Sequence, residues 1–218
     1  MALARIVLFA LCFCCAAPAL ADKTRLEIGR FSSGSLTGWS AEQMRGETDY
    51  RLVALQGVKR LQATCRDRGA SGLVHRARID LRATPTLHWS WRVAQVYTGL
   101  DETQKSGDDF PARVYVAVDG GWRRWQSRAL NYVWASRQPR GADWANAYLP
   151  QNVRMLALQS GAPAASGLLH EARNVRADLR RYFGRDYEFI DAVALMTDCD
   201  DAGGQAQAWY GDIYFNAD

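Results

Sequence analysis

Two acidic segments carry the side chains best suited to binding or chemistry in this chain. The polar connection at 97–110 is longer than most loops, and loops of that length are often functional. The acids are Asp101, Glu102, Asp108 and Asp109 in this connection, and Asp198, Asp200 and Asp201 further along the chain. Loop carboxylates can bind Ca²⁺, which takes about six to eight oxygen ligands. They can equally be solvated, with Asp108 or Asp109 paired to Arg113.

The second segment only partly matches a known calcium motif. Asp198 and Asp200 occupy the first and third positions of a helix–loop–helix calcium loop. Ala202 and Trp209 then stand at the fifth and twelfth positions, where oxygen ligands are required, so that motif is excluded. A turn at the end of a strand is the competing interpretation. The two segments could still combine across one mouth of the fold, which requires that they converge on a single cleft.

Carboxylates could also perform catalysis. Hydrolysis of a glycoside uses two carboxyl groups, about 5 Å apart or about 6.5–9.5 Å apart. Asp108, Glu171 and Asp198 are the residues that could supply such a pair. No Ser-His-Asp order, zinc-ligand spacing or glycine-rich phosphate loop accompanies them. The sequence therefore favours binding without catalysis and leaves the question of an enzyme open.

Polar side chains on strand-like segments extend the set of candidate binding residues. If these strands line a concave face, their amides and guanidinium groups supply the donors and acceptors that a polar ligand needs. If the face is convex, they are ordinary solvated positions. The ligand-binding residues predicted from both loops and strands are Asp108, Asp109, Arg113, Asn131, Trp134, Arg173, Asn174, Asp198 and Asp200.

The first residues indicate where the chain works. Arg5 is followed by the apolar run Ile6–Ala17 and by the small-x-small triplet Ala19-Leu20-Ala21. This pattern predicts a secretory signal peptide over 1–21 and a mature domain over 22–218 that is exported to the periplasm or beyond the cell. No later apolar run approaches about 18 residues, so no membrane span is expected in the mature form. The formal net charge is +4 and the charges are interspersed, which argues against a nucleic-acid partner.

Two of the five cysteines remain after the predicted cleavage. Cys12, Cys14 and Cys15 belong to the signal peptide, whereas Cys65 and Cys199 lie in the mature domain. An even pair in an oxidising compartment predicts one disulfide between them. The alternative is a pair of free thiols too far apart to bridge.

The elements that must position these residues are mainly strands. Alternating apolar segments separated by polar turns predict an all-β fold, a single-domain jelly-roll β-sandwich. In 87–93 the alternation sends Trp89 and Trp91 to the core, and the same reasoning sends Trp209 there. One short helix is predicted over 174–184. The predicted strands are Leu26–Phe31, Tyr50–Leu55, Arg60–Thr64, Ser71–Arg76, Thr86–Val93, Arg113–Val118, Leu130–Ala135, Val153–Leu158, Leu168–Val175, Ile190–Met196 and Ala206–Phe215.

Several ordered motifs resemble a known bacterial family. They include Leu87–Val93, Gly107–Val116, Asn131–Ser136, Met196–Asp201 and Tyr210–Phe215. Together they resemble the exported family called domain of unknown function 3047, over most of the predicted mature domain. That family has no established activity, so the resemblance implies a fold and a compartment rather than a reaction.

The family's pattern is in turn similar to galactose-binding-like β-sandwiches, which often bind sugars and often hold a structural Ca²⁺. By that analogy Glu27 and Asp212, on the first and last strands, are the predicted metal ligands, and pairing of Asp212 with an arginine is the alternative. The resulting hypothesis is a saccharide- or polar-ligand-binding module, with a cell-envelope component as a further partner. Two other hypotheses are a carbohydrate-active hydrolase or lyase that uses Asp or Glu, and a structural envelope protein. The oligomeric state stays open.

Overall fold

A computed structural model describes residues 25–123, 126–163 and 167–218 of the chain. The predicted signal peptide at 1–21 lies outside these residues and stays a prediction. Among the described helices, none is long and apolar enough to cross a membrane.

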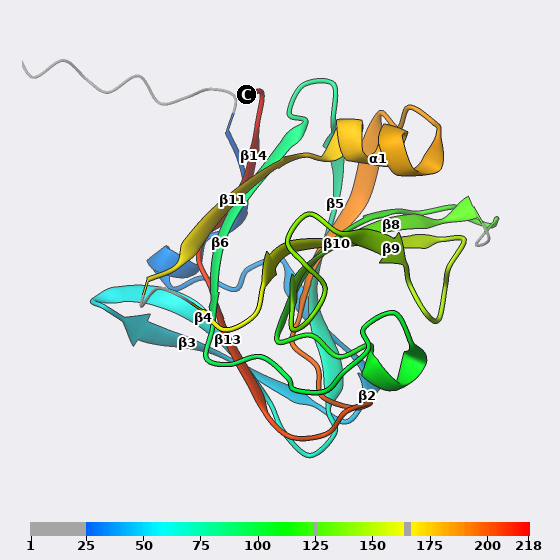
Figure 1. Cartoon of the computed structure of the whole chain (residues 1–218). Helices are drawn as coiled ribbons and strands as arrows, with labels where there is room; N and C mark the ends of the chain where they lie inside the picture. Colours follow the sequence, from blue (N-terminus) through cyan, green and yellow to red (C-terminus); the bar gives the residue numbers. More distant parts are fainter. Residues whose placement is uncertain (1–24, 124–125, 164–166) are drawn as a thin grey trace, which may run out of the picture.

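The described residues form two seven-stranded sheets, with one α-helix at one end (Figure 1). The predicted all-β sandwich is therefore confirmed. The first sheet contains β1 (Leu26–Gly29), β3 (Thr48–Leu55), β4 (Val58–Cys65), β6 (Thr86–Val93), β11 (Leu169–Asn174), β13 (Ala206–Tyr210) and β14 (Ile213–Asn216). The second sheet has the order β2 (Trp39–Arg45), β5 (Ala70–Asp80), β12 (Phe189–Met196), β7 (Ala112–Val118), β8 (Arg128–Ala135), β10 (Val153–Ser160) and β9 (Asp143–Ala145).

Alternation along the strands builds the core between the sheets. On β7, Ala112, Val114 and Val116 are fully buried in the main core, so the side chains of the intervening residues point to the outer face of the second sheet. On β6, Trp89 and Trp91 are buried as predicted, and their rings meet edge to face at 5.4 Å. The same alternation therefore decides which residues remain available on the outer face.

The predicted core position of Trp209 is wrong, and an extra residue explains why. Tyr210 pairs with Trp91, and Tyr214 pairs with His88. From Tyr210 to Tyr214 the chain advances four residues (214 − 210), whereas the paired segment of β6 advances three (91 − 88). Because of the extra residue, even-numbered side chains point into the core on β13 and odd-numbered side chains do so on β14. Tyr210 is fully buried and Trp209 lies on the other face. The single predicted strand 206–215 is accordingly two strands.

The short helix α1 (Val175–Phe183) lies within the predicted range 174–184, whose two end residues are its caps. The side chain of Asn174 accepts a hydrogen bond from the backbone N–H of Ala177 at 2.9 Å, which caps the first turn. Gly184 ends the helix with a φ of 66°, a left-handed conformation that favours glycine. Val175 and Leu179 bury the inner face of the helix against the core.

A disulfide joins Cys65 and Cys199, as predicted, with Cα atoms 6.0 Å apart. Cys65 ends β4 of the first sheet, and Cys199 lies in the connection that follows β12 of the second sheet. In the chain-entropy model a bridge across such a long loop contributes roughly 3–5 kcal/mol to stability. It also fixes the segment that carries Asp198 and Asp200.

Candidate functional site

Only part of the outer face of the second sheet is covered. Over β8 and β10, Phe110, Val133 and Met155 form a separate buried cluster against which Trp144 packs. Glu102 holds this cover in place, because its buried carboxylate accepts backbone hydrogen bonds from Ser136, Arg137 and Gln138. The outer face of β2, β5, β12 and β7 is left open beside this cover.

A groove of about 700 Å³ lies on this open face. Alanines of the central strand β12 lie in the middle of its floor, since Ala192 pairs with Ala117 and Ala194 lies between the larger side chains of Val74 and Tyr115. The rim includes the exposed side chains of Met44, Tyr148 and Leu149, of which the Tyr148 residue is 48% exposed. The other lining residues are Glu42, Gln43, Arg45, Ala70, Gly72, Arg76, Asp108, Arg113, Asn146, Val153, Leu195, Met196, Asp198, Asp200 and Asp201.

The two acidic segments converge at one end of this groove. Asp109 accepts a hydrogen bond from the backbone N–H of Ala202 through Oδ2. In the opposite direction, Oδ1 of Asp198 accepts from the backbone N–H of Phe110 at 3.0 Å. The connection before β7 and the connection after β12 are therefore tied to each other, and four of their acids line one cleft: Asp108, Asp198, Asp200 and Asp201.

Arg113 is buried at the centre of these acids. Its Nε donates to Oδ1 of Asp198 at 3.0 Å, and its Nη2 donates to Oδ2 of the same carboxylate. Nη1 lies 3.5 Å from Oδ2 of Asp108 and donates to the Tyr115 hydroxyl at 3.0 Å. The expected pairing of Arg113 with Asp108 is present, and the stronger bidentate partner is Asp198.

Burial dominates the electrostatics of this end of the groove. Loss of solvent raises the pKa of Asp108, although Arg113 and the Asn146 amide pull it down. Loss of solvent also raises the pKa of Asp200, and the neighbouring charges of Asp201 and Asp109 act in the same direction. The pKa of Tyr115 rises to about 12, so its hydroxyl stays protonated at neutral pH. Several acids therefore compete for one buried guanidinium.

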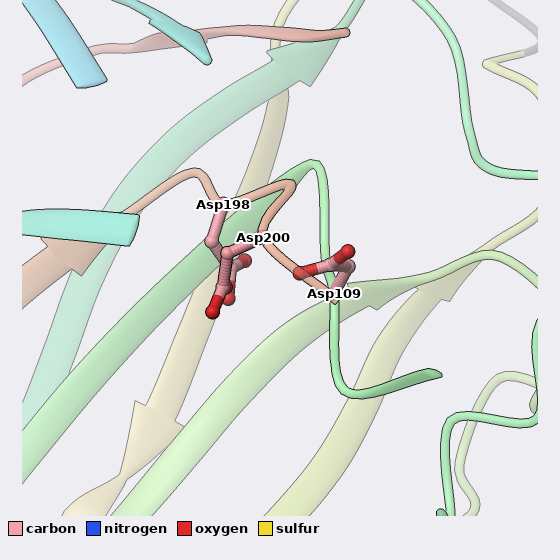
Figure 2. Close-up of side chains that lie close together, drawn as sticks. All are labelled: Asp109, Asp198 and Asp200. Carbon is pink, nitrogen blue, oxygen red and sulfur yellow. The ribbon is translucent and has the colours of Figure 1, made fainter. Parts of the chain in front are cut away.

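Three of these acids form a group that we call the acid cluster: Asp109, Asp198 and Asp200. One carboxylate oxygen from each lies within 4.8 Å of the others. Figure 2 shows the Asp198 and Asp200 side chains next to each other, with the Asp109 carboxylate turned toward them. Asp109 is fully buried, and its Oδ1 has no hydrogen-bond partner among the residues that the structure describes.

Sequence reasoning missed several polar residues of the groove, among them Asn146 and Tyr148. The side-chain amide of Asn146 donates to both carboxylate oxygens of Asp108, at 3.3 and 3.2 Å, and its carbonyl oxygen accepts from the Tyr148 and Leu149 backbones. The Tyr148 hydroxyl donates to the carboxylate of Asp201, with contacts of 2.9–3.0 Å. Both residues follow β9, a strand of three residues that is too short for an apolar alternation to predict it.

Four of the predicted ligand-binding residues do not line the groove and are held by other contacts. Trp134 is buried because its position on β8 faces the core, and Asn131 is buried beneath the cover on the other face. Arg173 pairs with the buried Asp178 of α1, and Asn174 serves as the helix cap. The structure brings together Asp108, Asp109, Arg113, Asp198 and Asp200.

The three catalytic candidates do not form one site. Glu171 lies on β11, where it accepts hydrogen bonds from the Trp91 indole at 3.1 Å and from Gln159 at 2.6 Å. It lines a different depression of about 470 Å³, whereas Asp108 and Asp198 both contact Arg113 in the groove. Glu171 is therefore not paired with Asp108 or Asp198.

The two predicted metal ligands at the chain ends are satisfied by other partners. Glu27 pairs with Arg25 at 2.6 Å. Asp212 accepts hydrogen bonds from the backbone and the hydroxyl of Ser32, in place of the arginine that was considered. Neither residue belongs to the group of three possible metal ligands found among the described residues. A metal at this position stays a prediction.

Several solved structures are similar to this chain. The family 11 carbohydrate-binding module from Clostridium thermocellum, in complex with a β-1,3-1,4-mixed-linked tetrasaccharide, is 7% identical with a TM-score of 0.47, covering 89% of this chain and 96% of that chain. The family 30 carbohydrate-binding module of a cellulosomal cellulase from the same organism is 10% identical with a TM-score of 0.48, covering 89% and 98%. A xyloglucanase domain of a Sinorhizobium fredii effector, in complex with cellobiose, is 11% identical with a TM-score of 0.45, covering 84% and 96%. Likenesses at this level carry no argument about the ligand of this chain.

No curated protein matches the sequence. A family model does match, over residues 37–214, and it contains the motifs that carry the resemblance, apart from the last residue of Tyr210–Phe215. That match also spans both acidic segments and every strand that forms the groove. The chain belongs to the family described as protein of unknown function, DUF3047.

Proposed function

We propose that this protein is an exported binding module that holds a saccharide in the groove on the outer face of its second sheet. The observation that carries the proposal is the groove itself: an open cleft of about 700 Å³ with alanines in the middle of its floor. Alanine and glycine on an otherwise continuous sheet allow a flat ligand to approach the backbone closely. Bulky side chains at the same outward positions would fill the cleft.

The chemistry of the walls supports a saccharide. A sugar ring presents C–H groups that pack against apolar or aromatic surfaces, and hydroxyl groups that need hydrogen-bond partners. The half-exposed ring of Tyr148, with Met44 and Leu149, offers an apolar surface for the C–H groups of the sugar. The carboxylates of Asp200 and Asp201, at the acidic end of the groove, offer hydrogen-bond acceptors for the sugar hydroxyl groups.

Blocking the floor of the groove tests this proposal. The probes are an array of plant, microbial and cell-wall oligosaccharides, followed by calorimetry with the best binder. Ala194→Phe places a ring between Val74 and Tyr115 and is expected to lower the affinity at least about 100-fold without loss of stability, because Ala194 faces outward. Tyr148→Ala is expected to lower it about tenfold through loss of ring packing.

Trp122→Ala is the matched control, since this tryptophan is 79% exposed and does not line the groove. Its affinity should equal that of the unmodified protein. The proposal fails if no oligosaccharide binds, or if Ala194→Phe binds as well as the unmodified protein does.

Export is part of the proposal and rests on the first residues of the sequence. Expression of the full chain in a Gram-negative host should yield a periplasmic protein whose N-terminus is at or near Asp22. A cytoplasmic product that keeps Met1 would contradict export and leave the groove experiment unaffected.

A further inference from the structure

Asp109 is a buried carboxylate, and one of its two oxygens has no hydrogen-bond partner among the described residues. The residue has no exposed surface, and its Oδ2 accepts from the backbone N–H of Ala202. Its Oδ1 has no partner among the described residues. Leaving an ionised oxygen buried and unpartnered is costly, and proteins avoid it unless a ligand or ion completes the site.

The surroundings of Asp109 do not offset its charge. Arg113, the buried arginine in contact with these acids, already bonds to Asp198 and to Asp108. Asp201 has the neutral Tyr148 hydroxyl as its partner, and Arg68 reaches the backbone oxygen of Asp200 at 3.4 Å. The carboxylates at this end of the groove therefore carry more negative charge than the contacting arginine neutralises.

The spacing of the acid cluster fits a hard cation. Calcium binds oxygen at about 2.3–2.6 Å, so two ligands of one ion lie at most about 4.6–5.2 Å apart. Magnesium demands a near-ideal octahedral shell and usually keeps several waters, which favours calcium at a buried group of three protein carboxylates. The three carboxylate oxygens of the acid cluster lie within 4.8 Å of one another. Asp200 is partly exposed and lines the groove, which gives an ion a route of entry.

We propose that the acid cluster binds one Ca²⁺, with Oδ1 of Asp109 and carboxylate oxygens of Asp198 and Asp200 as protein ligands. Asp198 keeps its bonds to Arg113 and binds the ion through the second lone pair of Oδ2, since its Oδ1 already accepts from the Phe110 N–H and from Arg113. Water and loop oxygens complete the shell. The ion joins the connection before β7 to the connection after β12, the two segments that form the acidic end of the groove.

Calcium binding is measured by calorimetry on protein freed of metal with EDTA, with CaCl₂ as the only addition. The expected result is one saturable site with a dissociation constant below about 1 mM, and tighter binding of Ca²⁺ than of Mg²⁺. At about 100 times that constant, Ca²⁺ should raise the melting temperature by several degrees. No saccharide is present, so this experiment and the groove experiment can fail independently.

Asp109→Asn is the diagnostic variant. It should weaken Ca²⁺ binding at least about tenfold. In EDTA, however, it should melt at the same temperature as the unmodified protein or higher, because the amide removes a buried charge and its N–H groups can donate to the neighbouring carboxylates. A purely structural Asp109 would give a lower melting temperature instead. Asp200→Asn is a second, more exposed variant, with the same expected loss of Ca²⁺ binding.

Two controls distinguish this site from other acids. Asp186→Asn alters an acid that pairs with Arg176 beyond the end of α1, and it should bind Ca²⁺ normally. The double variant Glu27→Gln/Asp212→Asn removes the alternative site on the terminal strands, and it should also bind normally. The proposal is overturned if Ca²⁺ up to about 10 mM does not bind, if Mg²⁺ binds more tightly, if Asp109→Asn leaves the affinity unchanged, or if the double variant abolishes binding.

Discussion

Two buried ion-pair networks in this sandwich differ in how their charge is balanced. On α1, the carboxylate of Asp178 receives two bonds from Arg173 and one from the Tyr132 hydroxyl at 2.9 Å. At the end of the groove, Arg113 makes the same two-pronged contact with Asp198, but Asp108, Asp109 and Asp200 lie close by. The first network has one acid for one arginine, and the second has a surplus of acid.

The difference separates a buried acid whose oxygens are all hydrogen-bonded within the protein from a buried acid with an oxygen free to bind a ligand. Both networks contain a buried aspartate in contact with arginine, and both join distant segments of the chain. In the Asp178 network both carboxylate oxygens are hydrogen-bonded, so nothing further is needed for stability. Next to Arg113, the Oδ1 of Asp109 is left without a partner among the described residues. Acid density alone does not distinguish the two networks, whereas charge balance and unused oxygens do.

Removing each arginine should give the largest separation between the networks. Arg113→Met leaves several buried carboxylates without their cation and should lower the free energy of unfolding by about 3–5 kcal/mol. Arg173→Met leaves one acid that still has the Tyr132 hydroxyl, and Arg173 is itself partly exposed, so about 1–2 kcal/mol is expected. Urea unfolding in EDTA measures both values. Equal losses would mean that the surplus of acid at the groove does not matter.

Neutralising one acid in each network should change stability in opposite directions. Asp178→Asn removes the charge that Arg173 requires and should cost about 1–2 kcal/mol. Asp109→Asn in EDTA should leave the stability unchanged or raise it, because the amide removes a buried charge that no metal ion offsets. The two side chains are both buried and the replacement is the same, so each variant is the control for the other. A similar loss in both, measured by thermal unfolding without metal, would remove the distinction.

Much of the fold followed from side-chain alternation, because burial has a period of two along a strand. The prediction of β6 at 86–93 matches its observed bounds, since Trp89 and Trp91 alternate with polar residues. The edge strand β2 was missed because it has no fully buried residue, and β9 has only three residues. The reversal between Tyr210 and Ile213 was missed because one extra residue leaves no mark on the pattern.

The site was only partly predictable. The acids of both loops were identified as candidates, and the Cys65–Cys199 pairing was predicted, but nothing local in the sequence places Asp109 beside Asp200. That contact requires β7 and β12 to be neighbours in the second sheet. The structural role of Glu102 depends on three backbone N–H groups, which no residue pattern reveals. Trp134 and Asn174 were candidates by residue type, whereas strand direction and helix capping decide their positions.

An exposed ion pair completes the comparison and should show the smallest effect. Asp80 accepts a hydrogen bond from the Arg82 side chain at 2.8 Å, and bonds from the side chain and backbone of Arg82 lower its pKa to about 2. Because the pKa of the folded state lies below the ordinary value of 3.8, this pair stabilises the protein above about pH 4 and loses that contribution as the pH falls through about 2.

Asp80→Asn keeps the turn acceptor for the Arg82 N–H but removes the charge. Thermal unfolding of the unmodified protein and the variant from pH 2 to pH 7 should show a small difference at neutral pH that shrinks at the acid end and with added salt. A difference that stayed constant down to pH 2 would show that Asp80 acts through its hydrogen bonds rather than its charge.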